Sequence, residues 1–537
     1  MWPHNYTPLA DSLAVSSLVA ALPIFVLLLL IGILRKPAWM AALSGLAAAL
    51  VVALAVYGMP AGTAFAAVGY GASFGLFPIG WIVYWAIVLY RITVETGNFE
   101  IIKDSIGGLT EDRRLQAMLI AFALGAFIEG AAGFGTPVAV AAAMLTGLGF
   151  SPFYAAGICL LANTAPVAFG SIGIPVVTLA GITGLPMNEL SAWVGRICAP
   201  VSVFVPAYLV LVMGGARALS GVWPAAAACG IAFAGMQFYV SNYIGPQLTD
   251  ILAALAAIVT MVVLLKIWKP KDTFHLADEG SAQLKPVAHG AGRTILAWSP
   301  YLFLVFFVLL WGQKPVQEIL NKATTAFPWP GLHNVVQRMP PVVAQPAPYA
   351  AMYNFNFLSA AGSACMFATI ASMLVLRVSI GKYAGILVAV AKQLFLSMVT
   401  IASVLGLAFL MNYCGATSTL GLAFAATGVL FPFFSAMLGW LGVFLTGSDT
   451  SANALFGNLQ VVTANRLGLD PVLMAAANSS GGVMGKMISL QSIAVAAAAT
   501  AMKPEDEARL FRFTMKHSIF LASVLGVITF IYAAMQK

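Results

Sequence analysis

The chain has 537 residues, of which 61% are hydrophobic and only 8% carry a charge. Soluble proteins carry a charge at roughly one position in four, so this composition excludes a soluble globular protein. The formal net charge of +8 does not indicate a nucleic-acid partner, because Lys and Arg are dispersed among short connections and form no run of like charge. Basic residues in the cytoplasmic loops of a membrane protein explain the excess better.

Continuous apolar segments of membrane-spanning length follow one another along the chain, without the alternation of a β-barrel. We therefore predict an all-α polytopic membrane protein with about 12–14 membrane segments, since one crossing needs roughly 20 apolar residues. The first segment follows a polar rather than basic stretch, which favours a spanning helix over a cleaved signal peptide. The predicted spans centre on 12–34, 37–57, 76–94, 193–215, 222–243, 247–267, 294–313, 352–376, 383–411, 417–438 and 513–535.

Two long connections organise the chain. The connection 268–293 contains Asp272, Asp278, Glu279 and several Lys residues, and we predict that it is a cytoplasmic linker between a first half, 1–267, and a second half, 294–537. The connection 314–350 is rich in Pro and poor in Lys and Arg, as expected of an external loop. With the basic connections in the cytoplasm, both termini lie outside.

The five cysteines lie far apart in apolar segments, with no Cys-x-x-Cys pair and no His at metal-ligand spacing. We interpret them as small apolar packing residues rather than disulfide or metal ligands. The sequence also offers no nucleophile with its base and no nucleotide-binding loop, so we expect no enzyme activity and no cofactor.

Two regions, 115–185 and 436–500, are apolar enough for the membrane but are interrupted repeatedly by Gly, Pro, Asn, Ser and Thr. Backbone that leaves a helix at membrane depth is tolerated only when it is buried in protein or lines an aqueous cavity. We therefore expect the functional site in these two regions.

The two interrupted regions resemble each other and predict a pair of inverted repeats. In each repeat we expect a re-entrant hairpin followed by a helix broken at Asn163-Thr164 or at Asn478-Ser479. Such paired discontinuous segments indicate a transporter binding site near the bilayer midplane. The corresponding segments are Gly125–Gly130 with Gly442–Gly447, Leu148–Pro152 with Leu467–Pro471, and Ala162–Thr164 with Ala477–Ser479.

The predicted hairpin tips, 129–136 and 446–453, favour an anionic ligand. A helix that restarts inside the membrane presents unpaired N–H groups and a dipole equivalent to roughly half a positive charge, and glycines allow close approach to the backbone. A small carboxylate is the natural candidate. The candidate substrate-binding residues are Gly133, Gly135, Thr136, Asn163, Thr164, Thr450, Ser451, Asn453, Asn478, Ser479, Ser480 and Lys486.

Glu129 and Asp449 occupy the two tips. An isolated ionised carboxylate in a dry site is costly unless it is paired or protonated, and ionisable residues inside a membrane often mark proton or ion pathways. We predict a proton-coupling role for one of them, with a structural hydrogen-bonding role as the alternative. For Lys486, substrate contact and a structural pair with Asp449 both remain open.

The segments Gly125–Thr136, Ala162–Gly173, Gly447–Asn453 and Ala477–Ser489 resemble those of the bacterial L-lactate permease family, which includes glycolate permeases. The resemblance covers nearly the whole chain. It implies uptake of L-lactate, D-lactate and glycolate with protons across the bacterial inner membrane, and an elevator-type movement of a transport domain against a scaffold. Asn163-Thr164 and Asn478-Ser479 are also similar to the Asn-Thr signatures of dicarboxylate carriers in a wider group of ion transporters.

The sequence thus predicts a multi-pass secondary active transporter that carries a small 2-hydroxy monocarboxylate, with the proton as coupling ion. A sodium-coupled dicarboxylate carrier of the same architecture is the main alternative. A passive anion channel and a membrane-embedded enzyme are less favoured alternatives, and the oligomeric state is left open.

Overall fold

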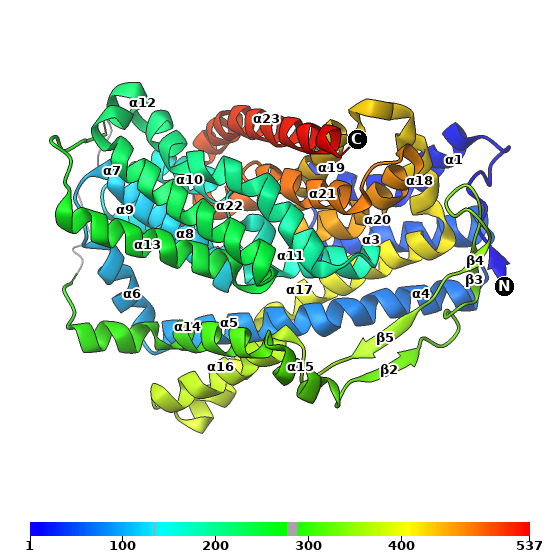
Figure 1. The fold of residues 1–537 in the computed structure, drawn as a ribbon, viewed down its shortest axis with the longest axis horizontal. Helices are drawn as coiled ribbons and strands as arrows, with labels where there is room; N and C mark the ends of the chain where they lie inside the picture. The colour runs from blue at the N-terminus through cyan, green and yellow to red at the C-terminus, as the bar shows by residue number, and fades with distance from the viewer. Residues whose placement is uncertain (134, 277–286, 537) are drawn as a thin grey trace.

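The computed structural model describes residues 1–133, 135–276 and 287–536, and most of them lie in helices (Figure 1). Phe134 of the first tip and Asp278, Glu279 and Lys285 of the predicted linker lie outside the described residues. The helices before the first hairpin are α1 (Leu13–Ala20), α2 (Leu22–Leu28), α3 (Ala38–Val51), α4 (Ala61–Phe74), α5 (Trp81–Glu95) and α6 (Asn98–Gly107).

The first hairpin region is followed by long helices and by the Pro-rich segment. The helices that connect the two hairpin regions are α12 (Met187–Tyr243), α13 (Thr249–Ile267), α14 (Ala291–Trp311), α15 (Lys314–Asn321), α16 (Ala361–Val375), α17 (Ile380–Cys414) and α18 (Ala416–Phe424). The chain ends with α23 (Pro504–Met535).

Within the described residues, 11 helices are long and apolar enough to cross a membrane, or up to 12 if one bent pair counts as a single span. The longest of them, α12, has 57 residues, which exceeds one crossing because a bilayer core is about 30 Å thick and a helix rises about 1.5 Å per residue. Gly215, with φ 70° and ψ −167°, divides α12 into two legs. These legs match the spans predicted at 193–215 and 222–243, so the all-α polytopic prediction is confirmed.

Two predicted spans differ from the structure. The span predicted at 352–376 begins as strand β5 (Met352–Phe355), and its helix α16 starts only at Ala361. The span predicted at 417–438 is interrupted by Gly428, whose φ of 57° breaks the helix. Hydropathy located both segments, but it did not distinguish apolar strand and turn residues from helical ones.

Short strands join the N-terminus to the Pro-rich segment. Strand β1 (Trp2–Pro3) pairs in parallel with β3 (Val336–Arg338), and β3 pairs antiparallel with β4 (Ala347–Pro348). Strand β2 (Thr325–Pro328) pairs antiparallel with β5. Figure 1 shows these strands and the N-terminus at the right end of the molecule, whereas the connection from α13 to α14 lies at the left end. The Pro-rich segment and the described flanks of the central connection therefore lie at opposite ends of the molecule.

The two interrupted regions form hairpins that enter from opposite ends. The first consists of α7 (Arg113–Gln116), α8 (Gly125–Ala131) and α9 (Thr136–Gly147), and the second of α19 (Phe431–Thr446) and α20 (Asp449–Leu467). The base of the first hairpin adjoins the central connection, where Arg114 bonds to Asp272. The helix that leads into the second hairpin adjoins the N-terminal segment, where Thr419 donates to the Tyr6 carbonyl at 2.9 Å. This opposite orientation confirms inverted repeats.

Each hairpin is followed by a discontinuous helix pair. In the first repeat, α10 (Pro152–Ala162) ends at Asn163 as predicted, and the chain resumes after a bend of 62° before α11 (Gly170–Thr183). In the second repeat, the break predicted at Asn478-Ser479 is wrong. Helix α21 (Pro471–Lys486) continues through these residues, and the break falls just before α22 (Leu490–Ala499). Ser489 caps the start of α22 by accepting from Ser492 N–H.

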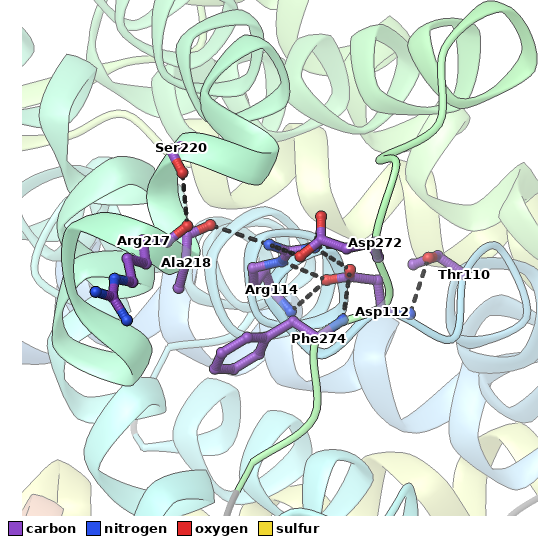
Figure 2. A network of polar contacts seen from close by, with 8 residues as sticks. All are labelled: Thr110, Asp112, Arg114, Arg217, Ala218, Ser220, Asp272 and Phe274. Carbon is purple, nitrogen blue, oxygen red and sulfur yellow. Dashed lines mark hydrogen bonds and ion pairs between the residues drawn. The ribbon is translucent and has the colours of Figure 1, made fainter.

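A buried arginine fixes the base of the first hairpin (Figure 2). The Arg114 side chain is fully buried; its Nη2 bonds Asp112 Oδ2 at 2.6 Å and its Nη1 donates to the Ala218 carbonyl at 3.1 Å. A further bond from Nη2 reaches the Asp272 carbonyl at 3.0 Å. Figure 2 shows Arg217, on the same turn of α12, pointing away from this network. The network joins the hairpin base to α12 and to the central connection, so these bonds fix the position of the hairpin base.

Candidate functional site

A cavity of about 160 Å³ lies where the two repeats meet. It is smaller than the clefts of roughly 300–1,000 Å³ that accommodate drug-sized ligands, so its size fits a small solute. The first repeat contributes Glu129, Val167, Gly170, Ser171, Ile174 and Pro175, and the second contributes Thr446–Ser451, Lys486 and Gln491. Helix α17 closes one side with Ser397, Thr400 and Ile401, and Ala38 of α3 completes the lining.

Glu129 lies in the last turn of α8 and lines the cavity. Its side chain accepts a hydrogen bond from Asn163 Nδ2 at 2.9 Å, from the residue at which α10 ends. Gly170 leaves room for the carboxyl group, because a Cβ atom there would lie 2.6 Å from Glu129 Oε1. The hairpin carboxylate is therefore held by the broken helix of its own repeat.

Asp449 occupies the equivalent place in the second repeat, in the first turn of α20. Ser479 Oγ donates to Asp449 Oδ2 at 2.6 Å, and Asn453 Nδ2 lies 3.4 Å from the same oxygen. A Cβ atom at Gly482 would lie 2.3 Å from Asp449 Oδ1. Both carboxylates are thus packed against a glycine and bonded to a polar side chain of the following discontinuous helix.

The two carboxylates differ in their electrostatic surroundings. Asp449 lies at a helix N-terminus, where the dipole favours negative charge, and receives hydrogen bonds from neutral donors. Glu129 lies at a helix C-terminus, where the dipole disfavours negative charge, and among the described residues Asn163 is the one hydrogen-bond donor to its carboxyl group. The helix dipoles therefore act in opposite senses on the two carboxyl groups.

A chain of amide side chains connects the two repeats behind the cavity. Asn453 Nδ2 donates to the Pro175 carbonyl of α11 at 3.2 Å, and Asn478 Nδ2 donates to Asn453 Oδ1 at 3.0 Å. Gln460 Nε2 then donates to Asn478 Oδ1 at 3.0 Å. All three amide residues are fully buried. The backbone of Asn478 therefore stays in the unbroken helix α21, while its side chain links α21 to α20 of the second hairpin.

The break in the first repeat contains strained backbone. Ser171 and Ile172 have φ of 48° and 60°, values that are unusual for residues with a side chain and most unusual for a β-branched one. Ser171 Oγ donates to the Ala132 carbonyl at 3.0 Å, which ties the break to the hairpin tip. Strain of this kind persists where surrounding structure enforces it and is concentrated at functional sites.

Lys486 is the last residue of α21 and lines the cavity. Its Nζ donates to the Gly447 carbonyl in the turn of the second hairpin at 2.6 Å. It lines the same cavity as Glu129 and Asp449. Lys486 thus supplies the one basic side chain beside two carboxyl groups among the described lining residues.

Five of the predicted site residues line the cavity: Glu129, Asp449, Thr450, Ser451 and Lys486. The other predicted residues do not line the cavity. Thr164 and Ser480 bond to carbonyls of their own helices, at Leu161 and Ala476. The remaining predicted residues are Gly133 and Gly135, with φ of 60° and 81° in the first tip, Thr136 at the start of α9, and the bonded Asn163, Asn453, Asn478 and Ser479.

The sequence analysis missed several residues of the site. Gly170 and Ser171 lie within a tract recognised as part of the break, but no pattern singled them out. Ser397 and Thr400 lie in α17, which reads as an ordinary apolar span. Asp250 does not line the cavity, but as a lone acid in the apolar segment 247–267 it is conspicuous in the sequence. The five cysteines are buried and free, and no group of three or more potential metal ligands occurs in the described part of the chain.

We expect Gly170→Ala and Gly482→Ala each to lower solute uptake by about tenfold, because forcing an extra methyl into a packed site costs roughly 1–3 kcal/mol. The added Cβ would displace Glu129 or Asp449. Gly235→Ala is the matched control, since Gly235 is helical with no atom within 4 Å of an added Cβ. Initial uptake rates in proteoliposomes measure the effect, and equal rates for all three variants would contradict it.

The inverted hairpins, the broken helices and the buried charged cavity define a membrane transporter. Residues 16–536 match the model of the L-lactate permease family, and the chain belongs to that family. It is 46% identical to the L-lactate permease of Bacillus subtilis and 45% identical to the glycolate permease GlcA of Escherichia coli, in each case over 99% of this chain and 98% of the relative. The solved structure of Neisseria gonorrhoeae MtrF is 14% identical, covers 88% of this chain and 83% of its own, and has a TM-score of 0.47. The protein is thus a multi-pass transporter of the bacterial inner membrane.

Proposed function

We propose that the protein takes up lactate, as both enantiomers, and glycolate by proton symport. Relatives named L-lactate permease and glycolate permease support a lactate or glycolate transporter. The observation that supports the proton coupling is the cavity itself, which is lined by two hairpin carboxyl groups and one lysine. Both substrates are small 2-hydroxy monocarboxylates, which suit the size of this cavity.

The second repeat supplies the anion half of the proposed site. The first turn of α20 leaves N–H groups without intrahelical partners, of which Ser448 caps one by accepting from Ser451 N–H. Thr450 and Ser451 of this turn line the cavity beside Lys486. A carboxylate there receives N–H donors, the positive end of a helix dipole and a full positive charge.

The first repeat supplies the proton half. With Glu129 and Asp449 ionised and Lys486 charged, the empty site has an excess of negative charge that repels an anion. Protonation of Glu129 removes this excess, so proton binding promotes lactate binding. Loading one proton and one monocarboxylate leaves the net charge of the site unchanged. The loaded site therefore moves across the membrane without an added electrostatic cost.

The proposed movement is an elevator-type displacement of the two hairpin regions against a scaffold. A small cavity of about 40 Å³ separates Thr450, Ser451 and Ala454 of the second hairpin from Val83 of α5 and three residues of α17. These scaffold residues are apolar, namely Val83, Ile401, Val404 and Leu405. An apolar boundary of this kind favours sliding. In this proposal each half, 1–267 and 294–537, contributes one hairpin region to the moving part, and the cytoplasmic linker 268–293 connects the halves.

A sodium-coupled dicarboxylate carrier is the second candidate. Its substrate would place a second carboxylate in the cavity, yet Lys486 is the one basic side chain among the described lining residues. A monocarboxylate therefore fits the charge of the site better.

The test is a competition assay in proteoliposomes. Labelled L-lactate uptake is measured against D-lactate, glycolate, pyruvate and succinate, with and without an inward proton gradient, and with sodium replaced. We expect lactate accumulation of about tenfold per pH unit, since one unit is equivalent to about 1.36 kcal/mol, with competition by D-lactate and glycolate. Sodium-dependent uptake of succinate would overturn the proposal in favour of the dicarboxylate carrier.

A further inference from the structure

Asp250 is a buried acid with no role in the site described so far. It is the second residue of α13 and is 1% exposed. Neither of its carboxyl oxygens has a hydrogen-bond partner within the described part of the chain. An ionised carboxylate in such a place is strongly unfavourable, and the helix N-terminus offsets only part of this cost. The group therefore needs a bound proton or another cation.

Asp250 lies directly behind the first hairpin tip. A Cβ atom at Gly130 would lie 2.8 Å from Asp250 Cβ and 3.0 Å from the Ile251 nitrogen, so only a glycine lets α13 approach α8 this closely. Gly130 is the neighbour of Glu129, which faces the cavity, whereas Asp250 does not line it. On a path from the cavity into the protein, the carboxyl group of Glu129 therefore comes first and that of Asp250 second.

Packing places Glu129 near Asp250, because Glu129 adjoins Gly130 on α8 and a Cβ atom at Gly130 would lie 2.8 Å from Asp250 Cβ. The electrostatic interactions of Asp250 with Glu129 and with the Cys198 thiol of α12 agree with this placement. Lys486 acts on Glu129 and Asp449 from the far side. No charged group of α11 or of the second leg of α12 acts on Asp250 among the described residues. Ionisation of both Glu129 and Asp250 is therefore unfavourable, because the one lysine near Glu129 is shared with a third carboxyl group, that of Asp449.

We propose that Asp250 is a second proton-binding group of the carrier and shares one proton with Glu129. In the transfer, the O–H bond of the Glu129 carboxyl breaks and an O–H bond forms on an Asp250 oxygen, so the proton moves and no electrons are exchanged between the residues. Glu129 takes the proton from the cavity, and Asp250 holds it out of contact with water. This inference rests on the proton symport proposed above.

Asp250→Asn tests the proposal, because asparagine keeps the shape of the acid and cannot exchange a proton. Two rates are measured in proteoliposomes without sodium: lactate exchange at equal pH on both sides, and net accumulation under an inward proton gradient. Asp506→Asn is the matched control, since Asp506 is also a first-turn acid, in α23, and lies far from full burial.

We expect Asp250→Asn to retain exchange within about twofold of the wild type and to lose most of the accumulation of about tenfold per pH unit. We also expect a change in the pH profile of exchange, which a purely structural residue would not produce. Unchanged accumulation with an unchanged pH profile would overturn the proposal, and so would parallel loss of exchange and accumulation in a correctly folded variant.

If Asp250→Asn does not fold, Asp250→Glu provides the second test, because it retains an exchangeable proton in a longer side chain. Proton-driven accumulation that persists with an altered pH profile supports the proposal, and an unaltered profile overturns it. Failure of the proposed function looks different, because then the wild-type protein itself shows no proton-driven accumulation or requires sodium.

Discussion

Glu129→Gln is expected to retain lactate exchange between equal solutions and to abolish accumulation driven by a proton gradient. Glutamine preserves the size of the side chain and an oxygen that can accept from Asn163, which in the wild type donates at 2.9 Å. It behaves as a permanently protonated glutamate, so the site can still bind the anion but cannot release a proton. The accumulation of about tenfold per pH unit should fall to equality across the membrane.

The experiment compares Glu129→Gln with Asp449→Asn and with Glu189→Gln, an exposed acid in the first turn of α12 that serves as the control. Asp449→Asn should impair exchange as well as accumulation, because it disturbs the bonds to Ser479 and Asn453 and the charge beside Lys486. If Glu129→Gln and Asp449→Asn both transport with unaltered pH dependence, neither residue is the coupling group. If only Asp449→Asn uncouples transport, the coupling role belongs to Asp449.

Lys486→Met should reduce lactate uptake by about 30-fold or more. Removing one partner of a buried charge pair costs roughly 2–5 kcal/mol, and here the substrate carboxylate is one partner and the lysine is the other. Methionine keeps much of the side-chain length but loses both the charge and the bond to the Gly447 carbonyl at 2.6 Å. The loss should appear mainly as a higher KM, because the ground-state anion already contacts the charge.

Lys392→Met is the matched control, since Lys392 is an exposed lysine in the spanning helix α17. Lys486→Arg separates the two roles of the lysine. Arginine keeps the charge but differs in shape and donor geometry, so partial uptake supports substrate contact. A variant with methionine at position 486 and wild-type KM would show that the lysine acts only as a brace for the hairpin turn.

Much of the fold could be predicted from the sequence because a membrane imposes simple constraints. Every span must be apolar over about 20 residues, so α3, α13 and α14 were located closely. The inverted hairpins were also predictable, because the segments that flank their tips resemble each other at similar spacing, Gly125–Gly130 with Gly442–Gly447 and Leu148–Pro152 with Leu467–Pro471. Strand β5 was not, since an apolar segment at a membrane surface has the same composition as a helix.

The site was predicted only in part, because its geometry depends on contacts between distant segments. The Asn-Ser pair at 478 and 479 reads like the Asn-Thr pair at 163 and 164, yet only the latter ends a helix. The difference arises from tertiary bonds, since Asn453 and Asp449 engage the side chains of Asn478 and Ser479 and leave the backbone helical. Likewise, the closeness of Asp250 to Gly130 depends on the packing of α13 against α8, which no local pattern encodes.

The most direct test of the account is a cryo-electron microscopy map of the protein in lipid nanodiscs at acidic pH with L-lactate. The account predicts ligand density enclosed between the start of α20, Lys486 and Glu129, with both hairpin tips in contact with the same cavity. Density for lactate elsewhere, or a map in which 115–185 and 436–500 form ordinary unbroken spans lying apart, would contradict it.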